Sequence, residues 1–127
     1  MQGPGYLISE EGNLYIDNIF DYDKVIPLVV NILGITAVCP AIKLDDNSIE
    51  NIREKALFHM KEYWSDKNYT FKVETKRSDK QYHMDSRAIS TDIGGYIFNN
   101  MDNISVDVRN PDVTLMIEIR NYTYIYS

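Results

Sequence analysis

Basic residues are concentrated in one short segment of an otherwise acidic chain, and they are the side chains best suited to contact a phosphate. Five of them fall within sixteen residues, at Lys72, Lys76, Arg77, Lys80 and Arg87. Lysine and arginine neutralise phosphate charges, and such a cluster is typical of a nucleic-acid-binding surface. From charge alone, a solvated strand end with mixed charges is the alternative interpretation.

The net charge of the whole chain does not favour binding to a polyanion. The 127 residues carry 13 Lys and Arg against 19 Asp and Glu, for a net charge of −6. Residues 1–69 hold six basic and eleven acidic residues, residues 70–127 hold seven and eight, and residues 72–87 hold five and three. Attraction to a nucleic acid therefore has to come from a local patch of positive charge.

No motif for catalysis or metal binding accompanies the basic segment. The sequence contains no Walker loop, no nucleophile elbow and no G-x-G-x-x-G loop. Cys39 is the single cysteine, and His59 and His83 do not have the spacing of a metal site. Asp45 and Asp46 are expected to stabilise a helix N-terminus rather than to act as an acid–base pair. We expect no catalytic residue, no metal site and no cofactor in this chain.

Composition indicates a globular protein of one domain or of two small halves. Hydrophobic residues make up 44% of the chain and charged residues 25%, the proportions of ordinary globular domains. The apolar runs are too short to span a bilayer, and the N-terminus lacks the pattern of a signal peptide. We expect a cytoplasmic protein that contacts no membrane.

Hydrophobic periodicity predicts strands and helices in the mixture of an α+β fold. Strands are expected near residues 6–8, 14–16, 36–44, 71–75, 104–108, 113–119 and 122–126, and helices near 25–33, 48–63 and 86–101. Pro40 inside the third strand favours an edge strand or a bulge. A turn at residues 66–68 separates the N-terminal half from the C-terminal half.

Two of the predicted helices have recognisable caps and buried stripes. Asn47 or Ser48 is expected to cap the first of them, and Ser86 the second. The stripes are Ile49, Ile52, Ala56, Met60 and Tyr63 in one helix, and Ile89, Ile93, Ile97 and Met101 in the other. The pair Gly94-Gly95 lowers helix propensity by about 1 kcal/mol per glycine, which indicates close approach by a strand or by RNA. We expect Gly94 to be packed and Gly95 to be more exposed.

Tyr122, Tyr124 and Tyr126 alternate at the end of the chain. Aromatic rings can serve as platforms on which nucleic-acid bases stack. Aromatic residues are also enriched in strands, where they pack across a sheet. The sequence alone leaves both interpretations open.

The order of these motifs resembles that of a THUMP domain. The segment FKVETKRSDKQYHMDSRAISTDIGGYIF, followed by VDVRNPDVTLMIEIR and TYIY, is similar to the THUMP domain of tRNA 4-thiouridine synthetases, also known as thiamine-biosynthesis proteins. The matching positions are Lys76, Arg77, Asp79, Lys80, Ser86, Gly94, Asn110, Pro111, Asp112 and Arg120. Upstream, LGITAVCPAIKL resembles the ferredoxin-like domain that precedes THUMP in those enzymes.

The resemblance implies an α+β fold with a partial ferredoxin-like unit in residues 1–46 and a THUMP domain with a mixed sheet in residues 47–127. The opening strand and helix of the ferredoxin-like domain have no counterpart before Tyr6. No Ser-Gly-Gly-x-Asp-Ser loop for ATP and no rhodanese segment is present, so we expect a fragment that is not an enzyme by itself.

In the resembled family, ATP activates a uridine of tRNA and sulfur replaces its 4-oxygen, while the ferredoxin-like and THUMP parts hold the acceptor stem and CCA end. That holding role is the function implied here, with tRNA as the partner. ATP and a cysteine desulfurase are implied for the full-length enzyme, and a homodimer is one way to replace missing strands. The RNA-binding candidates are Lys72, Lys76, Arg77, Lys80, Arg87, Gly95, Arg109, Asn110 and Arg120.

Two alternatives remain at this point. One is the THUMP arm of another RNA-modifying enzyme, such as an RNA methyltransferase or a pseudouridine synthase. The other is a protein-interaction module whose acidic N-terminal half binds a basic partner. Loss of RNA binding together with retained binding to a protein would favour the second alternative.

Overall fold

The computed structural model describes residues 4–9, 13–16, 37–78 and 81–127, with side chains from Pro40 onward. These residues form β1 (Pro4–Ser9), β2 (Asn13–Ile16), β3 (Ala37–Leu44), α2 (Ile49–Tyr63), β4 (Tyr69–Arg77), α3 (Ser86–Asn100), β5 (Ile104–Val106), β6 (Val113–Ile119) and β7 (Thr123–Tyr126). The helix expected near residues 25–33 lies outside the described residues, as does Lys80.

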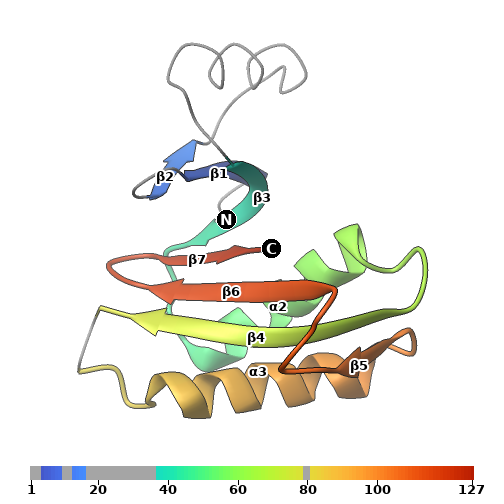
Figure 1. Cartoon of the computed structure of the whole chain (residues 1–127). Coiled ribbons are helices and arrows are strands. Elements are labelled where there is room, and N and C mark those ends of the chain that lie inside the picture. Colours follow the sequence, from blue (N-terminus) through green and yellow to red (C-terminus); the bar gives the residue numbers. More distant parts are fainter. Residues whose placement is uncertain (1–3, 10–12, 17–36, 79–80) are drawn as a thin grey trace.

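The described strands form one mixed sheet in the order β2-β1-β3-β7-β6-β4-β5 (Figure 1). β4 pairs in parallel with both β5 and β6, whereas the other pairs are antiparallel. Parallel neighbours need a crossover, and α3 supplies it. The predicted α+β class and mixed sheet are confirmed. The division of the chain at residue 46 stays a prediction.

Pro40 lies in a strand that has neighbours on both sides, so the predicted edge strand is wrong for β3 as a whole. β1 pairs with β3 from Ala37 to Ile42, but β7 pairs with it only from Ala41 onward. Pro40 therefore has a strand partner on one side only, as a residue without a backbone N–H requires. The missing N–H of Pro40 therefore requires an open side at that residue only, and the rest of the strand can pair on both sides.

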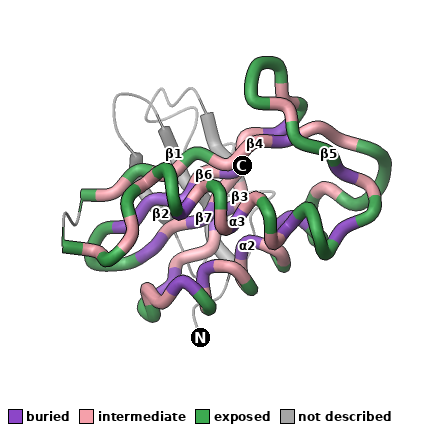
Figure 2. Tube along the Cα trace, turned by 90° about the horizontal axis from the view of Figure 1, so that it is seen from below, coloured by how far each residue is buried: buried purple, intermediate pink, exposed green. Residues whose placement is uncertain are grey.

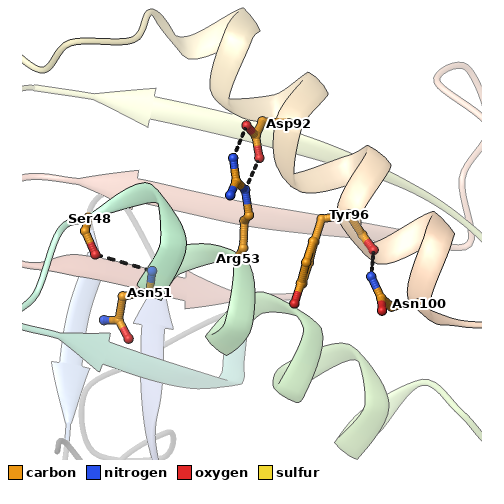
Figure 3. Close-up of polar contacts among 6 residues, drawn as sticks. All are labelled: Ser48, Asn51, Arg53, Asp92, Tyr96 and Asn100. Atoms are coloured by element: carbon orange, nitrogen blue, oxygen red, sulfur yellow. Dashed lines mark hydrogen bonds and ion pairs between the residues drawn. The ribbon is translucent and has the colours of Figure 1, made fainter.

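Helix α2 begins at the predicted cap. Asn51 N donates to Ser48 Oγ at 3.3 Å (Figure 3), which satisfies one of the amides that a helix start leaves open. The predicted stripe of Ile49, Ile52, Ala56 and Met60 is buried. Tyr63 is 44% exposed, so its predicted place in the stripe is wrong. The helix ends there, and the capping residue Trp64 packs against the core instead.

Helix α3 begins one residue earlier than predicted. Asp85 is the N-cap, and its Oδ1 accepts from Ala88 N at 2.7 Å, while the predicted cap Ser86 is the first helical residue. A carboxylate at this position also stabilises the positive end of the helix dipole. Ile89, Ile93 and Ile97 are fully buried, as predicted, and so is most of Met101.

Both helices pack side by side against one face of the sheet. Alternate residues of β6 and β7 point into this layer, and Figure 2 shows buried positions recurring along the helices and strands. The helices are tied together by Arg53, whose Nε and Nη2 donate to the two carboxylate oxygens of Asp92 at 2.5 and 2.7 Å (Figure 3). Both side chains are partly exposed, so the pair orients the helices more than it stabilises them.

The glycine pair of α3 occupies two different environments. A Cβ atom placed on Gly94 would lie 3.7 Å from Val73 Cγ2, and one on Gly95 would meet nothing within 4 Å. The expectation that Gly94 is packed and Gly95 more exposed is confirmed. The distance at Gly94 is ordinary van der Waals contact, so a methyl group fits there.

Candidate nucleic-acid interface

The parallel pairing of β4 and β6 brings their C-terminal ends to one end of the sheet. Lys76 is opposite Glu118, and Arg77 is opposite Ile119. A bond from Ser78 N to Ile119 O at 3.0 Å extends the pairing, and Arg120 follows directly. Residues more than forty positions apart in the sequence therefore meet here. We call this end of the sheet, which carries Lys76, Arg77 and Arg120, the basic end.

One row of side chains crosses this end of the sheet on the face opposite the helices. The row consists of Lys43, Tyr124, Glu118 and Lys76, which are directly opposite one another on β3, β7, β6 and β4. Neighbouring strands are separated by about 4.8 Å, so the two lysine backbones lie about 15 Å apart. The row ends in a positive charge on either side.

The acid inside this row is held by two partners. Glu118 is buried; Arg120 Nη2 donates to its Oε1 at 2.5 Å, and Tyr126 OH donates to its other oxygen. Burial alone would raise the pKa of Glu118, but the hydrogen bonds from Tyr126 and Arg120 and the charge of Lys76 outweigh it and lower that pKa. Glu118 is therefore an anion that orients Arg120 within the surface.

Cations lie over two of the three tyrosine rings. Lys43 Nζ is 4.4 Å from the ring centroid of Tyr122, and Arg120 Cζ is 5.5 Å from that of Tyr124. Tyr124 and Tyr126 are half-buried between neighbouring strands, which supports packing across the sheet. Tyr122 is 40% exposed, so part of its surface remains accessible.

Arg77 reaches the adjoining loop. Its Nη1 donates to Tyr82 O at 3.2 Å, and the side chain is half-buried. We assign it to positioning of the β4–α3 loop. Arg87, at the start of α3, is exposed, and it lines a shallow groove together with Lys76 of β4.

The remaining candidates lie elsewhere. Lys72 pairs with Glu74 at 2.6 Å on the same strand. Arg109 and Asn110 precede β6, at the other end of a seven-residue strand that is about 20 Å long. Their backbone amides both donate to Asp107 Oδ1 at 3.0 Å, which fixes the turn. Gly95 lies two turns into α3 beyond Arg87.

Lys43 was missed by the sequence analysis. Lys43 precedes Lys76 by 33 residues, and helix α2 lies between them in the sequence. Only the pairing of four strands places both lysines in one row. The one available signal was the alternation of Lys43 with Ile42 and Leu44 within residues 36–44, which places Lys43 on the opposite face of the strand.

The fold defines an α+β domain with a mixed sheet, and the cations at one end of it define a candidate polyanion-binding surface. The model of the THUMP domain matches residues 46–127, and the chain belongs to the THUMP family. The family predicted from the sequence is confirmed. No helix in the described part of the chain is long and apolar enough to cross a membrane.

Known proteins extend this assignment. A probable tRNA sulfurtransferase of Acetivibrio thermocellus is 40% identical over 125 residues, which cover 95% of this chain and 32% of that protein. A 4-thiouridine synthetase, solved as an RNA complex with bound ATP, superposes with a TM-score of 0.76 at 29% identity, over 94% of this chain and 31% of that one. TrmN from Thermus thermophilus, at 14% identity and a TM-score of 0.60 over 91% of this chain and 34% of that one, shares the fold alone. The chain spans about a third of the length of the sulfurtransferase relatives.

Proposed function

We propose that this chain is the RNA-holding part of a tRNA sulfurtransferase and that it binds the acceptor stem and CCA end of tRNA. Three findings support the proposal: membership of the THUMP family, similarity to sulfurtransferases, and similarity to a synthetase solved with RNA. The observation that carries it is the row from Lys43 to Lys76, which places positive charge on the sheet face opposite the helices.

The cations and the exposed tyrosine of the basic end have different roles in this proposal. Lys43, Lys76 and Arg120 contact phosphates, which positions the RNA without reading its sequence. Tyr122 offers a ring face to an unpaired base. Since the net charge of the chain is −6, the rest of the surface repels RNA and confines binding to this end.

The chemistry belongs to the portion of the relatives that this chain does not span. ATP binding, sulfur transfer and recognition of a cysteine desulfurase are proposed for that portion. The chain alone, mixed with ATP, a persulfide donor and tRNA, is expected to form no 4-thiouridine. The near-ultraviolet absorbance of the modified base, measured against a reaction without protein, checks this expectation.

A salt titration tests the RNA site. An acceptor-stem minihelix carrying a single-stranded CCA end is titrated with the chain at several salt concentrations. Each neutralised phosphate contributes about −0.9 to the slope of log affinity against log salt. The double variant Lys43→Gln, Lys76→Gln should therefore flatten the slope by about 1.8.

The matched control removes two exposed lysines that lie away from the basic end. Lys61→Gln, Lys67→Gln changes the net charge equally but lies on α2 and the turn after it. This variant should keep the slope of the parent chain. Equal flattening by both double variants would mean that net charge alone governs binding, and it would reject the basic end as the site.

A further inference from the structure

Strand β5 covers only the beginning of the outer edge of β4. Their pairing runs from Tyr69 to Phe71, and a bond from Asp107 N to Phe71 O at 3.0 Å extends it by one residue of the partner segment. The rest of β4, residues 72–77, pairs with β6 on one side and with no described strand on the other (Figure 1). A strand edge of this kind is a template for another strand.

The hydrogen bonds of β4 reveal which backbone groups face that open edge. Tyr69 N donates to Asn103 O at 3.0 Å on the β5 side, and Phe71 O accepts on the same side. Backbone groups alternate along a strand, so Val73 and Thr75 also direct their N–H and C=O groups outward. Among the described residues no strand pairs with these groups.

A groove follows this edge. It has a volume of about 320 Å³ and is lined by Val73, Glu74, Thr75 and Lys76 of β4 and by Ser86, Arg87 and Ser90 of α3. Successive strand residues point to opposite faces, so a groove lined by four in a row lies along the strand edge. Thr75 Oγ1 and Ser90 Oγ are 2.8 Å apart and hold α3 beside it.

We propose that an extended acidic peptide segment of a partner protein adds to this edge as a strand, beside Val73 and Thr75. Each of these residues presents a donor and an acceptor, which a peptide backbone satisfies in full. A phosphate chain only accepts hydrogen bonds, so it would leave both carbonyl oxygens facing anions. Lys76 and Arg87 line the groove with positive charge, whereas Glu74, which also lines it, pairs with Lys72 at 2.6 Å. The two cations therefore select acidic side chains on the partner.

Nuclear magnetic resonance with a defined probe tests the proposal. The probe is the acetylated heptapeptide Thr-Glu-Val-Glu-Val-Glu-Thr, added to the isotope-labelled chain. Hydrogen exchange at the Val73 and Thr75 amides is expected to slow by at least about tenfold in the saturated complex. Versions N-methylated at alternate residues, or with Lys for Glu, should bind at least about tenfold more weakly.

Variants locate the site. Val73→Pro removes one outward N–H and leaves the β6 ladder in place, so it should weaken peptide binding by at least about tenfold. Val108→Pro, at an exposed residue outside the groove, is the matched control and should bind normally. If Val73→Pro does not fold by circular dichroism, the N-methylated peptides decide. Unchanged exchange at Val73 and Thr75, or protection of these amides by heptauridylate but not by the peptide, would overturn the proposal.

Discussion

Thr123 Oγ1 donates to Asn47 Oδ1 across 2.7 Å, which joins the first residue of β7 to the segment before α2. The Asn47 side chain also places Nδ2 3.4 Å from the carbonyl oxygens of Arg120 and Asn121. Its backbone carbonyl accepts from Tyr82 OH at 2.7 Å. One residue therefore links the β6–β7 turn, which carries Arg120, to the β4–α3 loop.

Replacement of Asn47 is expected to loosen the basic end. Asn47→Ala leaves the Thr123 hydroxyl and two carbonyl groups without this partner, so the free energy of unfolding should fall by about 1–3 kcal/mol. The minihelix should also bind more weakly at a protein concentration at which the variant is folded. Urea unfolding and the RNA titration measure the two effects.

The control for this prediction is another asparagine. Asn99→Ala changes an exposed residue of α3 and should alter stability by no more than about 0.5 kcal/mol. An Asn47→Ala variant as stable as Asn99→Ala would show that the hydrogen bonds of the Asn47 side chain do not stabilise the fold.

Glu118 is expected to stabilise the fold at the cost of RNA affinity. Glu118→Gln removes the anion that Arg120 and Tyr126 hydrogen-bond, so stability should fall by about 1–2 kcal/mol. It also releases Arg120 and removes a negative charge from the row, so minihelix binding should strengthen and its salt slope should steepen. Glu74→Gln, on the same sheet face but exposed, tests whether charge alone is responsible. Weaker RNA binding by Glu118→Gln would mean that Arg120 binds RNA only when Glu118 orients it.

Both glycines of α3 are expected to accept alanine. Gly95→Ala places a methyl group in open space, and Gly94→Ala places one at contact distance from Val73. Each substitution should raise the midpoint of thermal unfolding, because alanine favours the helix. The free energy of unfolding should increase by up to about 1 kcal/mol. Destabilisation by Gly94→Ala alone would indicate that α3 packs more tightly against Val73 than the 3.7 Å distance implies. Weaker RNA binding by a stabilised Gly95→Ala would place RNA on α3.

Local patterns predicted most of the fold because each element carries its own signal. Ser48 and the apolar spacing that follows it determine α2, since both act within one helix. The two errors at helix ends have local causes: Asp85 competes with Ser86 for the cap of α3, and Trp64 replaces Tyr63 in the core. The prediction of an edge strand from Pro40 was wrong because β7 pairs with only the part of β3 that follows Pro40.

The candidate site was less accessible to sequence analysis because strand order creates it. Lys76 and Arg77 are adjacent in sequence, but Lys76 is exposed, whereas Arg77 is half-buried and bonds to the β4–α3 loop. Only the structure reveals this difference. Arg109 and Asn110 match the family pattern, yet β6 holds them far from the basic end. Lys43 joins the site only through β7 and β6, and no local pattern encodes that pairing.

A buried histidine is expected to make stability depend on pH. His59 is a fully buried residue of α2. Its Nε2 lies 2.8 Å from Ser127 Oγ, and its Nδ1 has no hydrogen-bond partner among the described residues. Burial lowers the pKa of His59 to about 4 from its ordinary value of 6.5, because the charged ring cannot be solvated there. The folded protein therefore holds His59 neutral at pH values at which the unfolded chain binds a proton.

This difference determines the sign of the effect. Between about pH 6.5 and pH 4 the unfolded state binds more protons than the folded state, so stability falls as the pH falls. From pH 7 to pH 4 the loss should approach about 3 kcal/mol, at about 1.4 kcal/mol for each pKa unit. Urea unfolding at half-unit pH steps measures it. His59→Gln should flatten the curve in this window, whereas His83→Gln, which removes an exposed ring, should not. A slope that persists in His59→Gln would assign the pH dependence to another group.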